Sequence, residues 1–417
     1  MLQPSPRPGQ TPVWIFALLY FSEGAPIGFL WWALPTLLRT EGVAVERITM
    51  LTALLVLPWT GKFLWAPLVD ALRTVRWGFR HWAISAQLAM GACLLPLLWL
   101  EPDEHVGAWV ALLFAHAFFA ATQDVAIDAL AVTTTAPAQR GWLNGAMQAG
   151  MLLGRSLFGG GAILLASYGG WRMVIVALIA AIWLSVVFLW KSVAEAAPPA
   201  NTRAAGAQFL HSLRQAAGSR TTWLGLGFAL TAGAGFESLG ALAGPFLVDA
   251  GVATKTTGVF FGLPVVGAML VGGLLGGRMA DRGERRRTVA RYLTLLSALV
   301  ASVGLGYWAG LPTGALMTLM ILVYVAIGLF TAASYALFMD LTDPRLGATQ
   351  FSTFMAATNG CEAWAAWAGG RLVGGLGYGG AFVVMPILAL VGLVFLRRLP
   401  RGAKQSLAKV DLAERRR

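Results

Sequence analysis

Two aspartates lie four residues apart where a long apolar run ends. The run AWVALLFAHAFFAA contains one polar side chain, His116, and Asp124 and Asp128 follow it. This spacing puts both carboxylates on one face of a helix, where they can share a cation or pass a proton. Neither carboxylate has a nucleophile or a metal-ligand pattern beside it, so a charge latch or a proton relay is expected rather than hydrolysis.

The composition identifies the solvent around that run. The chain has 417 residues, of which 57% are hydrophobic and only 12% charged, with a mean hydropathy of +0.69. Apolar runs of roughly 20 residues recur along it without the period-two alternation of barrel strands. We therefore expect an all-α integral membrane protein. Two cysteines and four scattered histidines predict no disulfide, metal site or cofactor.

The apolar runs predict twelve transmembrane helices. A connector rich in Ala and Pro, 192–220, divides them into two groups of six, between an N-terminal tail (1–12) and a basic C-terminal tail (398–417). The N-terminal six-helix bundle is expected over 13–191 and the C-terminal bundle over 221–397. The helices are predicted at 13–38, 48–69, 82–100, 107–132, 141–166, 171–191, 221–248, 256–280, 289–310, 314–340, 349–372 and 379–397.

Basic residues predict the orientation. With both termini in the cytoplasm, 24 of the 31 Lys and Arg residues fall in cytoplasmic segments and five in outer segments. The net charge of +12 then indicates orientation and contact with anionic lipids, not nucleic-acid binding. We expect a multi-pass protein of the inner membrane, and a monomer.

The two halves resemble each other. LLRTEGVAVERITML (37–51) is similar to FLVDAGVATKTTGVF (246–260), 209 residues later. Two parallel six-helix repeats are the architecture of the major facilitator superfamily. The loop GRMADRGERR, which contains Asp281 and Arg282, resembles that superfamily's G-x-x-x-D-R-x-G-R-R loop, with Glu284 in place of a glycine. The resemblance implies a gating role for Asp281 and Arg282.

Ionisable groups near the bilayer midplane are costly unless they are paired or face water. Glu23 and Arg155 lie at similar depth in the first and fifth predicted helices, which predicts an ion pair between them. Glu237 and Glu362 occupy the equivalent helices of the second half without a basic residue in those spans. Desolvation and mutual repulsion favour a protonated form there, so we predict proton coupling by this pair; local hydrogen bonding as a neutral acid is the alternative.

Lys62 lies as far from the cytoplasmic end of the second helix as Asp124 does from that of the fourth. We therefore predict a pair between Lys62 and Asp124, Asp128 or both. Arg73, Arg76 and Arg140 are alternative partners for Asp128. A structural latch and a transport site fit this pair equally well.

Polar and aromatic residues within spans are candidates for substrate contact. Trp31 and Trp32 could stack on a ligand, although packing or an interfacial belt explains them as well. His116 could relay protons, but a hydrogen bond to a neighbouring helix is the favoured interpretation. Arg155 would contribute a positive charge for an anionic substrate, with Glu23 beside it. The remaining candidates are Gln123, Asn144, Gln148, Tyr335 and Asn359.

Three stretches resemble the muropeptide permeases of the peptide–acetyl-coenzyme-A transporter family: FSEGAPIGF with LLRTEGV, LPWTGKFLWAPLVD and ATQDVAIDAL. The resemblance implies a proton-driven importer, and it extends strongly over 16–172. Muropeptide permeases are longer, whereas a siderophore branch of that family is as compact as this chain. The motifs carry over to Lys62, Trp65, Pro67, Asp70, Gln123, Asp124 and Asp128.

The expected function is therefore proton-coupled import of an anionic small molecule such as an anhydro-muropeptide. Its partners would be that substrate, a proton and membrane lipids. A ferric-siderophore importer and a drug or sugar exporter are the alternatives. A membrane enzyme would need a nucleophile–base set, and a sensor would need an output domain, so neither is expected.

Overall fold

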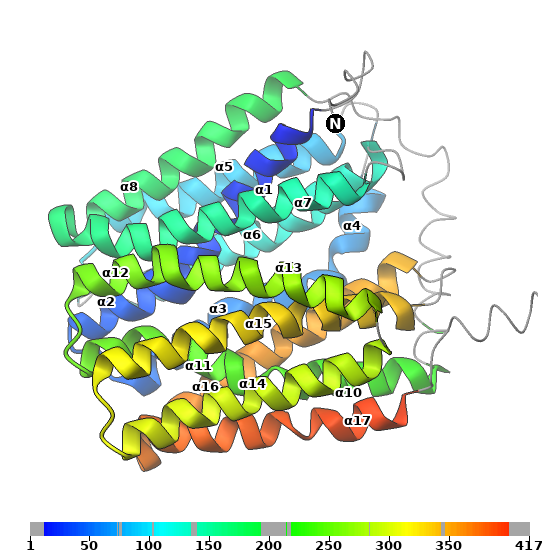
Figure 1. Ribbon diagram of the computed structural model, residues 1–417. Helices are drawn as coiled ribbons and strands as arrows, with labels where there is room; N and C mark the ends of the chain where they lie inside the picture. Colours follow the sequence, from blue (N-terminus) through cyan, green and yellow to red (C-terminus); the bar gives the residue numbers. More distant parts are fainter. Residues whose placement is uncertain are drawn as a thin grey trace, which may run out of the picture. The chain divides into compact units, whose positions relative to one another are not determined.

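The computed structural model describes residues 12–72, 74, 77–101, 104–134, 140–192, 214, 218–282, 284–342 and 347–399. Within these ranges every regular element is helical, as Figure 1 shows. The long apolar helices confirm the all-α, membrane-embedded class. Nine of the described segments are long and apolar enough to cross a membrane.

The described residues pack into two compact units that do not follow chain order. Unit 1 comprises residues 1–206 and 240–266, and unit 2 comprises 207–239 and 267–417. The sequence predicts instead that the chain divides into two bundles at the 192–220 connector. Residues 240–266 lie within the predicted C-terminal bundle but pack with the N-terminal part of the chain.

Unit 1 contains the first half of the chain and a later segment. Its elements are α1 (Val13–Gly28), η1 (Phe29–Ala33), α2 (Leu34–Thr40), α3 (Val45–Gly61), η2 (Lys62–Leu64), α4 (Ala66–Ala71), α5 (Phe79–Leu94), η3 (Leu95–Leu98), α6 (Val106–Thr134), α7 (Arg140–Arg155), η5 (Ser156–Gly160) and α8 (Gly161–Ser192). The end of α11 (Ala234–Asp249), α12 (Thr254–Phe260) and η6 (Phe261–Val265) complete it.

Unit 2 contains the remaining helices, with the start of α11. They are α10 (Arg220–Ala232), α13 (Val266–Arg282), α14 (Arg285–Trp308), α15 (Thr313–Leu341), α16 (Gly347–Ala389) and α17 (Gly392–Arg398). Helix α14 packs on α15 and α16, and α10 packs on α16 and α17.

Glycines bring α1 and α7 into backbone contact. Gly24 and Gly28 on α1 form a G-x-x-x-G pair, and Gly150 and Gly154 form another on α7. A Cβ at any of the four would meet backbone atoms of the facing helix. Small residues at this spacing let membrane helices approach closely. This crossing holds the polar part of α1 against the rest of unit 1.

Two long helices each contain one residue with a non-helical backbone. Gly170 in α8 has φ of 63°, and Gly377 in α16 has φ of 69°. Glycine tolerates this left-handed region because it has no Cβ. Both breaks lie where the sequence predicts a short connector, at 167–170 and 373–378.

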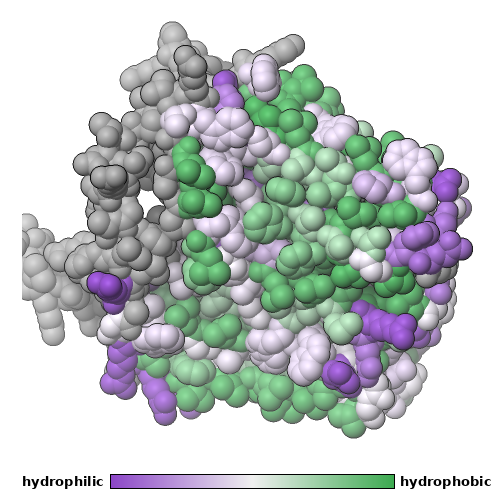
Figure 2. Space-filling model, turned by 180° about the vertical axis from the view of Figure 1, so that it is seen from behind, coloured by the Kyte–Doolittle hydropathy of each residue, from purple (hydrophilic) through white to green (hydrophobic). Residues whose placement is uncertain are grey.

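Apolar side chains dominate the outer surface. Figure 2 shows that hydrophobic residues cover most of one face, with hydrophilic ones gathered at its margins. Large exposed side chains include Leu64, Leu263, Leu274, Val394 and Trp190. A surface of this kind needs lipid rather than water around it.

Candidate functional site

The candidate site is a cluster of charged and polar side chains in unit 1. It begins on α1, where Ser22 is fully buried and Glu23 is 4% exposed. One Glu23 carboxylate oxygen, Oε2, has no hydrogen-bond partner in the structure. A buried carboxylate oxygen without a hydrogen-bond donor from the protein is costly as an anion.

The predicted pair of Lys62 and Asp124 is confirmed. Helix α3 ends at Gly61, three residues after Pro58, and the tighter turn η2 begins with Lys62. The Lys62 ammonium donates to Asp124 Oδ2 on α6, and both side chains are largely buried. The two helices pack against each other, so this pair joins them. A buried, paired charge is costly to separate.

Asp128 lies one turn beyond Asp124 and has a different partner. The Tyr20 hydroxyl on α1 donates to its Oδ1. Asp128 also reaches the accessible surface, whereas Asp124 is 5% exposed. The two aspartates therefore link α6 to two other helical segments, η2 and α1. Their roles in gating or proton transfer stay predictions.

The predicted ion pair between Glu23 and Arg155 is wrong. No ion pair joins them, although both are among the described residues, and Arg155 Nε is buried without a hydrogen-bond partner. Arg155 packs its backbone against Gly28, a turn further along α1 than Glu23. Glu23 interacts electrostatically with Asp124, Asp128, Lys62 and Arg155. Depth along the helices was matched, but depth does not fix which face a side chain occupies.

Sequence reasoning missed a buried amide that binds Ser22. Gln87 on α5 donates from Nε2 to Ser22 Oγ over 3.0 Å, and Gln123 on α6 donates to the same oxygen over 3.3 Å. Both amides are fully buried, and neither Oε1 has a hydrogen-bond partner. Ser22 Oγ thus joins two amides whose own acceptor oxygens are unpartnered. The available signal was that Gln87 is the one amide in the apolar run 83–98.

His116 and Trp65 brace this cluster through hydrogen bonds between helices. His116 Nδ1 lies 3.0 Å from the Met90 carbonyl oxygen on α5, as expected of a structural histidine. The Trp65 indole donates to Thr122 Oγ1 over 3.2 Å. These contacts fix the face of α6 that carries Gln123 and Asp124.

The two glutamates of unit 2 surround one thiol. A Cβ at Gly233 would lie 3.3 Å from both Cys361 Sγ and Glu237 Cγ. Glu362 also interacts electrostatically with the Cys361 thiol. Both predicted glutamates therefore interact with the same thiol, which lies near the break between α10 and α11 at Gly233. Proton coupling by Glu237 and Glu362 stays a prediction.

Three π-helical segments meet in another part of unit 1. η1, η5 and η6 contact one another, and such bulges often occur at functional sites. The Ser156 hydroxyl donates to the Gly262 carbonyl, and a Cβ at Gly160 would overlap the backbone of Gly258 and Gly262. This contact attaches the 240–266 segment to η5. Arg39 pairs with Asp249 at 2.6 Å at the end of the same segment.

The remaining candidates are spread out. Trp31 packs edge-on against Trp59, and Trp32 stacks on Phe261, so aromatic neighbours surround both. Tyr335 is exposed and Asn359 is half-buried in unit 2. Arg282 and Gln148 are exposed. The structure does not describe Arg73 and Arg76, nor the side chains of Pro67, Asp70, Asn144, Asp281 and Arg140.

Comparison with known proteins gives one family. The model of the Major Facilitator Superfamily matches residues 16–365. The chain is 25% identical to the anhydromuropeptide permease of Escherichia coli K12 over 403 residues, which cover 92% of this chain and 78% of the permease. Its fold is similar to that of a D-xylose-proton symporter, with a TM-score of 0.74, 14% identity and coverage of 93% and 97%. A bacterial homologue of the lysosomal transporter Spinster, inward-facing and occupied, gives a TM-score of 0.68 at 17% identity, with coverage of 94% and 96%.

Proposed function

The chain belongs to the Major Facilitator Superfamily, and we propose that it is a proton-coupled secondary active transporter that imports an anionic small molecule. The substrate class we favour is an anhydro-muropeptide, because the 25% identical relative is named for its transport. Import would proceed across a bacterial inner membrane by alternating access, with both termini in the cytoplasm.

Twelve spans in two six-helix halves are part of this proposal. Nine described segments qualify as candidate spans, and two of them, Gly145–Trp190 and Gln350–Arg398, have 46 and 49 residues. Each of these two is long enough for two crossings and contains the break at Gly170 or Gly377. Helix α3, with 17 residues, lies just below the length of a qualifying helix. One additional crossing in each of these two segments, together with α3, raises the number of proposed spans from nine to twelve.

The observation that carries the proposal is the buried charge cluster in unit 1. Three carboxyls (Glu23, Asp124 and Asp128) and two cations (Lys62 and Arg155) interact where apolar helices pack. Such charges in membrane helices support transport more often than stability alone, because their burial is costly. Asp128 is accessible and Glu23 is buried, which suits stepwise transfer of a proton between them. Glu237 and Glu362 would form a second proton site.

The unpartnered polar atoms support an anionic substrate rich in amides. The buried Nε of Arg155 would donate to a substrate carboxylate, and the free Oε1 atoms of Gln87 and Gln123 would accept from amide N–H groups. Glu23, Trp31, Trp32, Tyr335 and Asn359 remain candidates for further contacts. Lys62, Asp70, Asp281 and Arg282 would act in gating. We expect a monomer that requires no cofactor.

Substrate-dependent proton movement tests the proposal. The full chain in liposomes that contain a trapped pH-sensitive dye would be given an anhydro-muropeptide or a ferric siderophore. We expect the lumen to acidify with the muropeptide, and Glu23→Gln to abolish this signal while Glu104→Gln, an exposed control, retains it. Acidification with the siderophore alone would move the substrate to the alternative class. Uptake that continues without a proton gradient would contradict proton coupling, and transport only outward would favour an exporter.

A further inference from the structure

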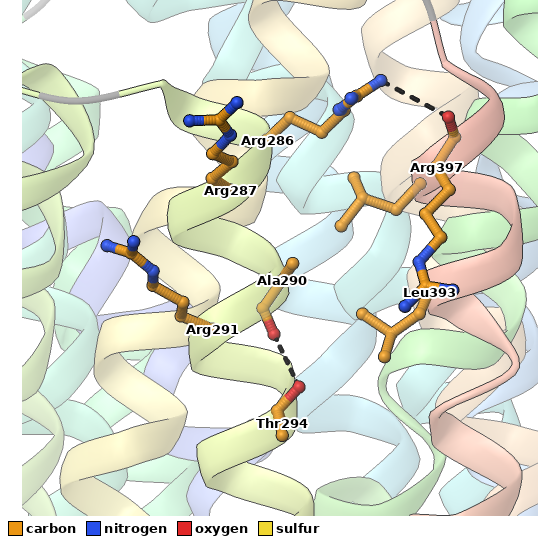
Figure 3. A pocket seen from close by; sticks show the side chains of 8 residues that line it. Arg286, Arg287, Ala290, Arg291, Thr294, Leu393 and Arg397 are labelled. Carbon is orange, nitrogen blue, oxygen red and sulfur yellow. Dashed lines mark hydrogen bonds between the residues drawn. The ribbon is translucent and has the colours of Figure 1, made fainter.

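An arginine-lined pocket lies between α14 and α17 in unit 2. Its volume is about 470 Å³, and four arginines line it: Arg286, Arg287 and Arg291 from α14 and Arg397 from α17. Leu393 and Leu396 of α17 supply apolar walls. In Figure 3 Arg286 is directed from α14 toward Arg397 on α17, and Arg287 and Arg291 lie on the other side of α14 in this view.

The pocket has more positive charge than its acidic neighbour can offset. Glu284 pairs with Arg287 at 2.7 Å and lies 3.8 Å from Arg286. Among the described residues neither Arg291 nor Arg397 takes part in an ion pair. Four guanidinium groups therefore face one carboxylate, which leaves a site for an anion.

Helix polarity adds to the unbalanced charge. A helix N-terminus carries a partial positive charge and favours anions, yet α14 starts with three arginines. Glu284 occupies its N-cap position without a side-chain cap hydrogen bond, so the first-turn N–H groups are not capped by it. Arg286 Nη1 meanwhile donates to the Leu399 carbonyl over 2.8 Å, which ties α17 to this end of α14. Arg287, Arg291 and Arg397 also line the pocket, where an anion would offset their charge.

The surroundings specify an amphipathic anion. Helices α14 and α17 both belong to segments apolar enough to span a membrane. Leu295 on α14 is 45% exposed and Val394 on α17 is 47% exposed, so apolar surface continues from the pocket along both helices. Arg291 lies six residues into α14, roughly 9 Å from its start at 1.5 Å per residue. A ligand that fits has a phosphate among the arginines and hydrocarbon along the leucines.

We propose that the groove between α14 and α17 binds the phosphodiester headgroup of an anionic phospholipid. Arg291 and Arg397 would contact the phosphate, and Arg287 would share it with Glu284. The acyl chains would lie along Leu393 and the exposed apolar residues below it. The proposal goes beyond transport and does not rest on it, since it needs only that the chain is embedded in a membrane.

Lipid binding by the purified full chain in a neutral detergent tests this site. The probes are phosphatidylglycerol, phosphatidylcholine and inorganic phosphate, and the readouts are the bound-lipid mass in native mass spectrometry and the Tm. We expect saturable binding of phosphatidylglycerol alone. Arg291→Gln with Arg397→Gln should weaken it roughly 30-fold, the loss expected for two basic contacts to an anionic lipid.

The control is Arg47→Gln with Arg371→Gln, which removes two exposed arginines elsewhere and should leave the affinity unchanged. Replacement of the first pair by lysine should restore much of it. The proposal is overturned if the 291/397 variant binds phosphatidylglycerol as tightly as the parent chain. It is also overturned if inorganic phosphate at millimolar concentration displaces the lipid, because the site would then recognise a free anion. A variant that elutes as an aggregate is replaced by the lysine pair, whose intermediate affinity decides in the same way.

Discussion

The indole ring of Trp32 stacks on the phenyl ring of Phe261, with ring centroids 5.6 Å apart and 17° between their planes. The two residues are far apart in sequence, and both lie in π-helical segments. Gly159 of the third such segment abuts the Trp32 ring, and Ser156 binds the Gly262 carbonyl. A side-chain stack, a hydrogen bond and glycine contacts therefore join the 240–266 segment to the rest of unit 1.

Substitution of Gly160 tests whether close backbone approach holds this contact. In Gly160→Ala, the new methyl group would overlap the backbone at Gly258 and Gly262, whereas in Gly161→Ala its nearest neighbour would be the Ser156 carbonyl oxygen at 3.8 Å. Overpacking should destabilise the contact by about 1–3 kcal/mol. The readout is thiol labelling of Ser156→Cys in a chain with Cys93 and Cys361 replaced. We expect Gly160→Ala to accelerate labelling several-fold, and equal rates in the two alanine variants would contradict the prediction.

The buried pair of Lys62 and Asp124 should be strongly coupled. Lys62→Ala leaves Asp124 charged and buried, and such a loss costs about 3–5 kcal/mol. The double variant Lys62→Ala/Asp124→Ala removes the unpaired charge as well, so it should be more stable than Lys62→Ala alone. Chemical unfolding in detergent of all four members of the cycle gives the interaction energy. If the two single losses simply add, the ion pair does not hold α3 and α6 together.

Glu23 is expected to carry the transported proton. Glu23→Gln mimics the neutral acid, so it should preserve folding and exchange of substrate across the membrane. Net uptake driven by a proton gradient should fall to the level of empty liposomes, because glutamine cannot release a proton. Counterflow and gradient-driven uptake are measured side by side, with Glu46→Gln as an exposed control. Normal gradient-driven uptake by Glu23→Gln would assign coupling to Glu237, Glu362 or the aspartates instead.

Neighbouring glycines on α13 should respond oppositely to alanine. A Cβ at Gly272 would collide with the Val325 carbonyl on α15, but at Gly273 it would meet nothing within 4 Å. Gly272→Ala should therefore lower stability by about 1–3 kcal/mol. Gly273→Ala should be neutral or slightly stabilising, since alanine favours helix more than glycine does. Thermal unfolding of both variants in one detergent decides, and similar Tm values would show that α13 and α15 do not pack through Gly272.

The apolar runs predict most of the helices, because few structures other than helices can span a bilayer. The predicted connectors at 167–170 and 373–378 contain the observed breaks at Gly170 and Gly377. Interruptions within spans were not foreseen. The predicted helix 48–69 is instead α3, η2 and α4, and the predicted helix 221–248 changes from α10 to α11 at Gly233. Hydropathy is the same on both sides of such breaks, so it cannot report them.

The sequence predicts how deep in the membrane each charged residue lies, but not which face of its helix carries the side chain. Equal depth and neighbouring helices were enough to find the pair of Lys62 and Asp124. The same argument failed for Glu23 and Arg155, because a pair also requires both side chains on facing sides of their helices. Gln87 was overlooked because an uncharged amide carries a smaller burial cost than a charge and attracts less notice in an apolar run.

The division of the chain into units has a consequence for how the protein is made. Unit 1 includes residues 240–266, which follow the first 33 residues of unit 2 in the chain. During synthesis, Trp32 and Gly160 therefore cannot contact the 240–266 segment until about 60 further residues have been added after residue 206. At 5–20 residues per second this delay is about 3–12 s. During that time unit 1 of the nascent chain is incomplete. A chaperone or lipid could then bind η1 and η5 before the 240–266 segment contacts them.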